Sequence, residues 1–294
     1  MVNTVVVGLG RSGIGAARLL KTSGKSVIVI DSGNGEALER KAADLKKQGI
    51  AVQINTPLLP ESLQAWQNNL ERVVISPGIA WDHPTLQHLR SHGVAIDGEM
   101  AVAWDALQSI PWIGITGTNG KTTVTHLLSH VLEHSGLKAP MGGNMGVSAA
   151  EMSLELQGST TNHPDWLVME LSSYQIEAAE RIHPSIGIWT TLTPDHLERH
   201  GTLENYRAIK RGLLERSELA ILNADDPDLR QQRKSWNGGL WVSANGPSPD
   251  DNPVDVWIDA EGWVREAEQA LFEAKALKLP GDHNLQNMLL VTAA

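Results

Sequence analysis

Two glycine-rich loops constrain the fold of this 294-residue chain more than any other feature of its sequence. The first is GLGRSG at 8–13 and the second is TGTNGKTT at 116–123, and each lies between a short apolar segment and a predicted helix. A strand, a tight glycine turn and a helix form the βα unit whose helix-terminal amides can hold a phosphate group. The chain is therefore predicted to be an α/β protein with two phosphate-binding turns.

Short strands alternate with helices on both sides of a break in the pattern near residues 108–111. In the first part, strands are predicted at 4–7, 26–30 and 72–76, and helices at 12–23, 36–48 and from His83-Pro84 onward. In the second part, strands are predicted at 112–116, 166–170, 186–189 and 219–223, helices at 122–135, 206–216 and 283–294, and a loop at 244–253. Such alternation predicts parallel sheets with helices on both faces. The break predicts two domains, 1–108 and 109–294.

The first loop fits the pattern G-x-G-x-x-G, and Asp31 ends the next strand, where an acid can accept hydrogen bonds from a ribose hydroxyl. NAD, a flavin and a nucleotide sugar all carry a diphosphate that such a loop can hold. A tight turn without a ligand is the structural alternative. This loop alone therefore allows a dinucleotide-dependent oxidoreductase as one function.

The second loop resembles a Walker A loop. Its working end, Gly120-Lys121-Thr122, supplies backbone amides around phosphates, an ammonium group for the terminal phosphates and a hydroxyl for magnesium. The strict pattern requires glycine at position 115, where this chain has Ile115. The loop predicts ATP or GTP as a ligand and makes a redox function less favoured.

Several acids and histidines lie where they can serve a nucleotide site. Glu170 ends an apolar strand, the position of an acid that faces the phosphates, and magnesium needs only one or two such carboxylates. His196 and His200 stand four residues apart, the spacing of a transition-metal pair, but no third ligand follows at a motif spacing. The histidines at 126, 130 and 134 are interpreted as the polar edge of a helix.

Composition excludes several other classes of protein. The chain has 24 basic and 34 acidic residues, a formal charge of −10, which disfavours binding to nucleic acid. It has no cysteine, so disulfides and thiolate metal sites are excluded. No apolar run is long enough to span a membrane, and the first residues do not form a signal peptide. A cytoplasmic protein without a membrane partner is expected.

Taken in order, the motifs resemble those of the Mur ligase family of ATP-dependent amide-forming enzymes. They are TGTNGKTT at 116–123, GGNMG at 142–146, MELSSYQIE at 169–177, LTPDHLERHGTLENYRAIK at 192–210, NADD at 223–226 and GDHNLQN at 281–287. Within the family, the stretches at 8–13, 76–79 and 170–175 resemble the members that add D-glutamate to UDP-N-acetylmuramoyl-L-alanine. A member that adds another amino acid is the nearest alternative, and folylpolyglutamate synthases are disfavoured because they lack the first domain.

The resemblance implies an N-terminal Rossmann-like domain for the UDP-sugar, a central P-loop domain for ATP and a C-terminal domain for the amino acid. The chain ends seven residues after Asn287. The C-terminal domain is therefore expected to be missing, and the chain is expected to bind its nucleotides with little or no turnover. A monomer is expected. A nucleotide-binding regulator without catalysis is the alternative from another class.

The resemblance also implies roles for single residues. The catalytic residues would be Lys121, His196 and Lys210. ATP would be bound by Gly117, Thr118, Asn119, Gly120, Lys121, Thr122 and Thr123, with adenine at Asn284 and Asn287. The UDP-sugar would be bound by Gly10, Arg11, Ser12, Asp31, Ser32, Ser76 and Asn144. Two magnesium ions would be held by Thr122, Glu170, His196 and Lys210, with Lys210 converted by CO2 into a carbamate.

Overall fold

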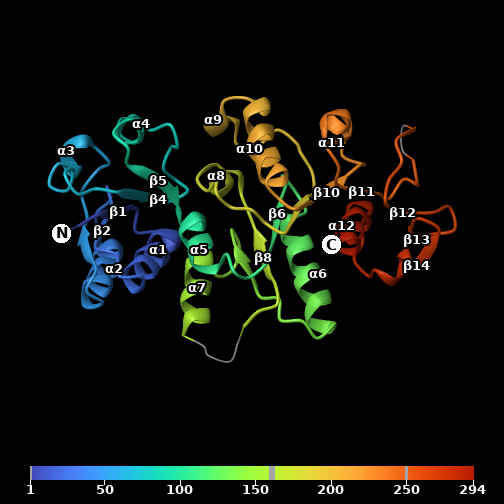
Figure 1. The fold of residues 1–294 in the computed structure, drawn as a ribbon, viewed down its shortest axis with the longest axis horizontal. Coiled ribbons are helices and arrows are strands. Elements are labelled where there is room, and N and C mark those ends of the chain that lie inside the picture. Colours follow the sequence, from blue (N-terminus) through green and yellow to red (C-terminus); the bar gives the residue numbers. More distant parts are fainter. Residues whose placement is uncertain (1, 159–162, 249–250) are drawn as a thin grey trace. The chain divides into compact units, whose positions relative to one another are not determined.

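The computed structural model describes residues 2–158, 163–248 and 251–294, so two residues of the predicted loop at 244–253 lie outside the described part. The chain forms two compact units (Figure 1). Unit 1 comprises Met1–Ser109, Gly146–His163 and Glu177–Ile182, and unit 2 comprises Ile110–Met145, Pro164–Ile176 and His183–Ala294. Unit 1 thus includes two later segments that were predicted to belong to the second domain. The roles assigned to the two domains stay predictions.

Unit 1 is built on a five-stranded parallel sheet, which confirms the predicted fold class. Its strands, in spatial order, are β3 (Ala51–Gln53), β2 (Val27–Ile30), β1 (Thr4–Val7), β4 (Arg72–Ile75) and β5 (Ala95–Gly98). In register, Val5 lies opposite Ile28 on one side and Val73 on the other. The central strands β1 and β2 are buried on both faces, so apart from Thr4 they are apolar and do not alternate with polar residues.

Helices cover both faces of this sheet. Val6 and its neighbours in register face one layer of helices, while Val5 and Val7 face the other, because successive strand side chains point to opposite sides. The first layer contains α1 (Arg11–Thr22), α2 (Glu36–Lys47) and α5 (Glu99–Leu107). The second contains α3 (Pro60–Leu63) and α4 (Pro84–Ser91). Helix α7 (Ala149–Gln157) packs against α1 and α5.

Unit 2 contains a nine-stranded sheet. The strands β6 to β12 are parallel to one another, and β13 and β14 are added at the β12 side in antiparallel pairing. The strands, in spatial order, are β14 (Gln269–Glu273), β13 (Trp263–Glu266), β12 (Val256–Ile258), β11 (Leu240–Ser243), β10 (Leu219–Asn223), β9 (Ile186–Trp189), β6 (Trp112–Thr116), β8 (Leu167–Glu170) and β7 (Met141–Gly143). The outer strands β7 and β11 to β14 were not predicted from the sequence.

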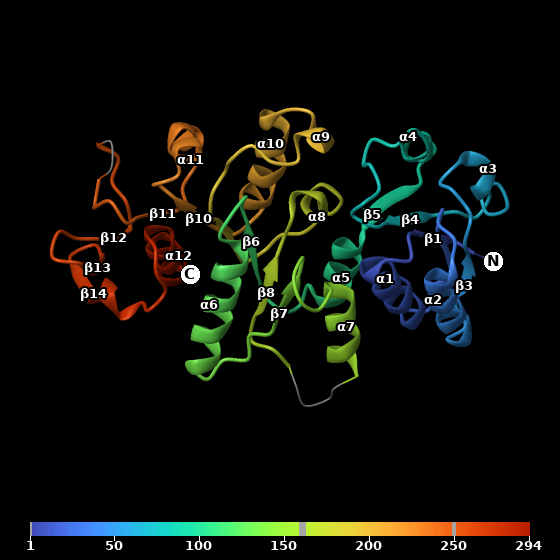
Figure 2. The ribbon, with the colours of Figure 1, turned by 180° about the vertical axis from the view of Figure 1, so that it is seen from behind.

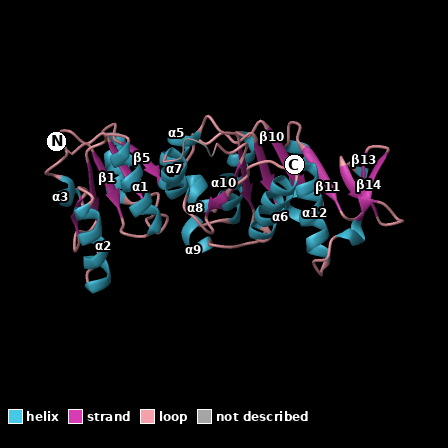
Figure 3. Cartoon of the chain, turned by 90° about the horizontal axis from the view of Figure 1, so that it is seen from below, coloured by secondary structure: helices cyan, strands magenta, loops and turns pink. Residues whose placement is uncertain are grey.

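The sheet of unit 2 also lies between helices (Figures 2 and 3). On one face, α6 (Lys121–His134) and α12 (Asp282–Ala293) pack against the apolar side chains of the central strands. On the other, α10 (Leu203–Glu215) packs against β9 and β10. The short helices are α8 (Ser173–Glu177), α9 (Leu197–His200) and α11 (Pro227–Gln232), with 3-10 turns at Arg233–Ser235 and Ala274–Ala276. Among the described helices, none has the length and apolarity needed to cross a membrane.

Candidate active site

The second glycine loop connects β6 to α6 and depends on two left-handed glycines. Gly117 has φ 149° and Gly120 has φ 86°, values that residues other than glycine rarely adopt. A Cβ atom on Gly117 would lie 1.9 Å from the hydroxyl of Thr190. Helix α6 makes its first intrahelical bond from Val124 N to Gly120 O at 2.9 Å, so the preceding amides of its first turn have no helical carbonyl to bond. Such amides are suited to a phosphate.

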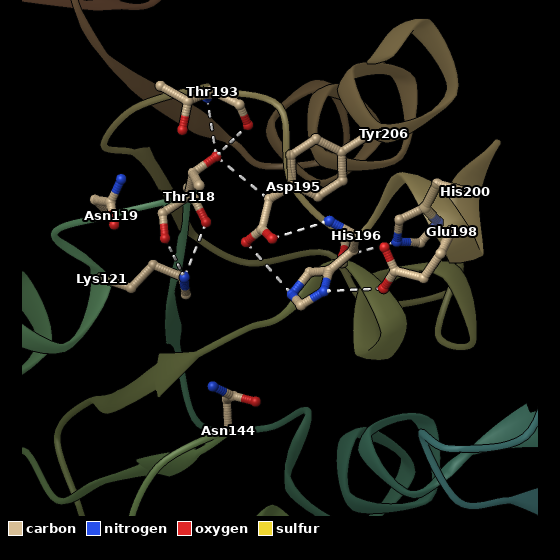
Figure 4. Close-up of polar contacts among 12 residues, drawn as sticks. Thr118, Asn119, Lys121, Asn144, Thr193, Asp195, His196, Glu198, His200 and Tyr206 are labelled. Carbon is tan, nitrogen blue, oxygen red and sulfur yellow. Dashed lines mark hydrogen bonds and ion pairs between the residues drawn. The ribbon is translucent and has the colours of Figure 1, made fainter. Parts of the chain in front are cut away.

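The loop is fastened to the segment that follows β9 (Figure 4). The amide of Thr118 donates to the carbonyl of Thr191 at 2.8 Å, and the amide of Asn119 donates to the hydroxyl of Thr191 at 3.0 Å. Thr193 N donates to the hydroxyl of Thr118 at 3.0 Å. The amides of Thr118 and Asn119 therefore set the shape of the loop, and the first turn of α6 presents the amides that follow.

Lys121 lies over the loop that it follows. Its ammonium group donates to the carbonyls of Gly117 and Thr118, each at 2.9 Å. Burial lowers the pKa of Lys121, and the nearby charges of Glu170 and Asp195 oppose that shift. The side chain is thus a partly desolvated cation at the position where a terminal phosphate would lie.

Glu170 is held at the end of β8 by two polar side chains. The hydroxyl of Thr122 donates to one carboxylate oxygen at 2.9 Å, and the amide of Asn144 donates to the other at 2.8 Å. Glu170 is only 1% exposed. Hydroxyl and carboxylate oxygens are the ligands that magnesium prefers, so this pair fits a magnesium ion that keeps water and substrate oxygens. Within the described residues, no three His, Asp or Glu side chains gather as a metal cluster.

Lys210 lies on α10, with its amine inside the same site. Its Nζ donates to Gly117 O at 2.9 Å and to the hydroxyl of Thr116 at 3.3 Å, and it lies 4.6 Å from the ring centroid of Tyr206. Lys210 is 1% exposed. Burial, followed by the charge of Lys121, lowers the pKa of Lys210 to about 7. A substantial fraction of this amine is therefore neutral at neutral pH, as a nucleophilic or carbamylated lysine requires.

His196 and His200 lie in different environments. His196 has φ 53°, a strained conformation for a residue with a side chain, and its Nε2 lies 3.4 Å from the carboxylate of Asp195 (Figure 4). His200 is buried, with its Nε2 2.9 Å from the hydroxyl of Ser173. Burial lowers the pKa of His200 to about 4. The second histidine therefore supports α8, whereas the first faces the pocket.

A pocket of about 260 Å³ collects these side chains. Of the residues predicted for the site, it is lined by Gly117, Lys121, Asn144, His196 and Lys210. It is also lined by Ser172, Ser173, Tyr174, Asp195 and Tyr206, to which no role was assigned from the sequence. For Tyr206 a signal existed, because it precedes Lys210 by four residues and so shares its helix face. Asp195 directly precedes the predicted His196, and the residues at 172–174 follow the predicted Glu170, so each of them is adjacent in sequence to a residue predicted for the site.

The two asparagines assigned to adenine lie at the start of α12. Both are buried, and Asn287 Nδ2 donates to Asn284 Oδ1 at 3.1 Å. Asn284 Nδ2 donates to Pro280 O at 2.7 Å. A Cβ atom on Gly120 would lie 2.7 Å from Asn287 Oδ1, so this asparagine contacts the glycine loop. The pair is therefore adjacent to the predicted phosphate site, and its contact with adenine stays a prediction.

The first glycine loop forms part of a separate pocket in unit 1. This pocket has a volume of about 360 Å³ and is lined by Gly8, Asp31, Ser32, His83 and residues of the 56–59 and 78–80 turns. Both oxygens of Asp31 accept backbone amides, from Leu9 at 2.6 Å and from Gly33 at 2.8 Å. Asp31 therefore stabilises the loop. The sequence predicted only a ligand contact for this residue.

The remaining predicted residues of this loop lie around the start of α1. Gly10 is its N-cap, and Arg11 and Ser12 are its first two residues. Arg11 Nη1 donates to Gly146 O at 2.6 Å. The hydroxyl of Ser76 is buried, and no hydrogen-bond partner for it occurs in the described part of the chain. A Cβ atom on Gly8 would lie 2.5 Å from that hydroxyl, so the loop passes directly over Ser76.

Comparisons with known families match both parts of the chain. Residues 2–98 match the Mur ligase MurD-like N-terminal domain, and residues 115–294 match the Mur ligase middle domain. A protein of Parasynechococcus marenigrum (strain WH8102) named UDP-N-acetylmuramoylalanine--D-glutamate ligase is 71% identical, over 100% of this chain. A protein of the same name from Prochlorococcus marinus (strain MIT 9313) is 65% identical. The chain spans 64% of the length of each relative.

Solved structures with a similar fold are more distant in sequence. The UDP-N-acetylmuramate:L-alanyl-gamma-D-glutamyl-meso-diaminopimelate ligase of Neisseria meningitides has a TM-score of 0.61 at 18% identity, covering 100% of this chain and 92% of that one. A murein peptide ligase of Psychrobacter arcticus 273-4 has a TM-score of 0.57 at 18% identity, covering 100% of this chain and 64% of that one. These likenesses show a shared fold.

Proposed function

Because the chain belongs to the Mur ligase family, we propose that it forms the UDP-sugar-binding and ATP-binding part of a ligase that joins D-glutamate to UDP-N-acetylmuramoyl-L-alanine during peptidoglycan precursor synthesis. The names of its relatives support this pair of substrates. The observation that carries the proposal is the pocket where Lys121, His196 and Lys210 converge beside Asn144. A ligase of this kind must bring anions together, and this pocket holds the ammonium group of Lys121 beside polar side chains.

ATP is proposed to place its phosphates on the first turn of α6. The amides of that turn face the phosphates, and Lys121 moves from its two loop carbonyls to the terminal phosphate. The buried Asn284 and Asn287 are proposed to contact adenine. The contact of Asn287 with the glycine loop supports this assignment.

Two magnesium sites are proposed around the same phosphates. Thr122 and Glu170 would hold one ion, and His196 with a carbamate on Lys210 would hold the other. The 2.9 Å bond between Thr122 and Glu170 supports the first, and the buried amine of Lys210 supports the second. The carbamate would form when the neutral amine attacks CO2 and loses a proton, which turns the lysine side chain into an anionic oxygen ligand. Magnesium, when bound, would neutralise the negative charge of the reacting groups.

The residues of the chain are proposed to position the reacting groups. Lys121 balances charge while the L-alanine carboxylate of the substrate attacks the γ-phosphorus and the bond to ADP breaks. The product of this step is an acyl phosphate. The amine of D-glutamate attacks its carbonyl carbon, phosphate leaves and the amine loses a proton. Asn144, bonded to Glu170, is proposed to lie between the metal site and the sugar.

The UDP moiety is proposed to bind the first glycine loop and its pocket. The pocket of about 360 Å³ beside Asp31 and Ser32 is large enough for a nucleoside. The diphosphate would lie at the start of α1, near Arg11, Ser12 and Ser76. The buried hydroxyl of Ser76 supports a polar ligand at this loop, because leaving a buried hydroxyl unpaired costs free energy.

Turnover tests the proposal. A protein of the relatives' full length that contains this sequence should release phosphate from ATP only when UDP-N-acetylmuramoyl-L-alanine and D-glutamate are both present. L-glutamate is the matched control for the amino acid. Release that is independent of the UDP-sugar, or that prefers another amino acid, would contradict the proposed substrates.

A further inference from the structure

Three helices of unit 1 begin near one another beside the first glycine loop. They are α1, α5 and α7, and α7 packs against both of the others (Figures 1 and 2). The N-terminal ends of helices carry partial positive charge and unpaired amides. Glu99 opens α5 at this point and is 3% exposed.

Glu99 caps a helix other than its own. Its Oε1 accepts the amide of Ala150 at 2.6 Å, and Ala150 is the second residue of α7, whose amide has no intrahelical acceptor. Ser148, the N-cap of α7, accepts the amide of Glu151 at 3.3 Å. The first turn of α7 is therefore held by its own Ser148 and by Glu99.

This turn leads directly to the arginine of the glycine loop. Gly146 lies two residues before Ser148, and its carbonyl accepts Arg11 Nη1 at 2.6 Å. A Cβ atom on Gly15 would lie only 3.0 Å from the hydroxyl of Ser148, so α1 and the start of α7 are in close contact. A shift of this turn would move the carbonyl that holds Arg11.

We propose that Glu99 is a positioning residue for the UDP-sugar site, because it fixes the first turn of α7 and thereby the Gly146 carbonyl that orients Arg11. The inference rests on the proposed function of Arg11 at the diphosphate. An arginine that is oriented before the ligand arrives loses less conformational freedom on binding. Burial raises the pKa of Glu99 to about 7, Glu151 adds to the shift, and the Ala150 amide, Arg11 and Ser148 oppose it.

Calorimetry on the 294-residue chain tests the proposal with UDP-N-acetylmuramoyl-L-alanine and Mg-ATP as separate titrants. Glu99→Ala should weaken UDP-sugar binding about tenfold, the effect expected for the loss of one hydrogen bond, and leave Mg-ATP binding unchanged. Glu99→Gln should keep nearly full affinity, because its amide oxygen can still accept the Ala150 amide. Glu155→Gln, on the exposed side of α7, is the matched control and should bind as the wild type does.

A double-mutant cycle separates this role from a general loss of structure. In an Arg11→Ala background, Glu99→Ala should weaken UDP-sugar binding little further, because Glu99 acts through Arg11. If Glu99→Ala does not fold, Glu99→Asp takes its place, since the shorter side chain keeps the charge but withdraws from Ala150. Unchanged affinity in the Glu99 variants, or an equal loss for both titrants, overturns the inference. A wild-type chain that does not bind the UDP-sugar would instead refute the proposed function, and this inference with it.

Discussion

Lys121 and Lys210 lie in one pocket, and burial lowers the pKa of both. The charge of Lys121 lowers the pKa of Lys210 further, since like charges repel. Asp195, which lines the same pocket, opposes both shifts. The two lysines therefore suit different tasks. Lys121, which donates to two loop carbonyls, suits charge balance, and Lys210, whose pKa is about 7, suits covalent carbamylation.

Replacing Lys121 removes the cation proposed to face the terminal phosphate. In a full-length protein, Lys121→Ala should lower kcat about 100-fold or more, the loss typical of one donor at a site of developing charge. Steady-state phosphate release measures it. Lys234→Ala, an exposed lysine of unit 2, is the control and should keep the wild-type rate. A Lys121→Ala enzyme with a near-normal rate would contradict the assignment.

Lys210 is tested by chemical rescue. Lys210→Ala should be inactive in the full-length protein, because it lacks the proposed oxygen ligand. Added formate or acetate should restore part of the activity, since a small carboxylate can supply that oxygen in the vacated space. The comparison is the rate of phosphate release with and without carboxylate, with chloride at equal ionic strength as the control. Full activity of Lys210→Ala without rescue would show that no carbamate is needed.

Site residues that belong to one contiguous motif were predictable from the sequence, whereas those brought in by folding were not. Lys121 and Thr122 follow a glycine loop, and Glu170 ends an apolar strand, so their neighbours predict their location. Ser173 and Tyr174 line the pocket and belong to the motif stretch at 169–177, but no role was assigned to them from the sequence. The hydrogen bond between His200 and Ser173 depends on how α8 and α9 pack, and the spacing of residues along the sequence does not reveal that packing.

Among the elements, the central strands were predictable and the outer ones were not. β1, β6 and β9 are buried throughout, so their apolar runs identify them. β7 is only Met141–Gly143, and β13 and β14 carry exposed polar residues at the edge of the sheet. Edge strands receive their stability from pairing with a neighbour, so their own sequence carries a weaker signal. The predicted parallel sheets with helices on both faces are nevertheless confirmed.

Helix α10 carries Tyr206 and Lys210, and its start is fixed by a cap. The hydroxyl of Thr202 accepts the amide of Asn205 at 3.1 Å. Thr202→Ala should lower the free energy of unfolding by about 1 kcal/mol, the usual cost of a lost N-cap. Thr202→Ser keeps the hydroxyl and is the matched control. Urea unfolding measures both variants, and equal stability of Thr202→Ala and the wild type would show that this cap contributes nothing.

The contact of α5 with α7 predicts a pH dependence. A glutamate carboxyl in water ordinarily has a pKa of 4.5, and burial raises the pKa of Glu99 in the folded protein to about 7. The stability that neutral Glu99 provides is therefore fully present below pH 4.5 and is lost as the pH rises through 7. Glu99→Gln cannot ionise, so its free energy of unfolding should not fall with this group's ionisation. Between about pH 5 and about pH 8 the variant should therefore gain up to about 3 kcal/mol in free energy of unfolding relative to the wild type. Urea unfolding at both pH values checks this, and parallel pH profiles would refute it.

For the whole molecule, a formal charge of −10 stands beside two sites proposed for phosphates. The two facts agree because each site uses local donors. One site has the first amides of α1 together with Arg11, and the other has the first amides of α6 together with Lys121. The net charge instead disfavours long polyanions, as the composition predicts. The monomeric state and the cytoplasmic location stay predictions.

The first glycine loop is proposed to hold a UDP-sugar and the second to hold ATP. Calorimetry of the 294-residue chain with UDP-N-acetylmuramoyl-L-alanine, Mg-ATP and NADH tests both assignments in one experiment. We expect micromolar binding of the UDP-sugar and of Mg-ATP, with no heat from NADH. Binding of NADH without binding of the UDP-sugar would contradict the account and favour a dinucleotide site in the first loop.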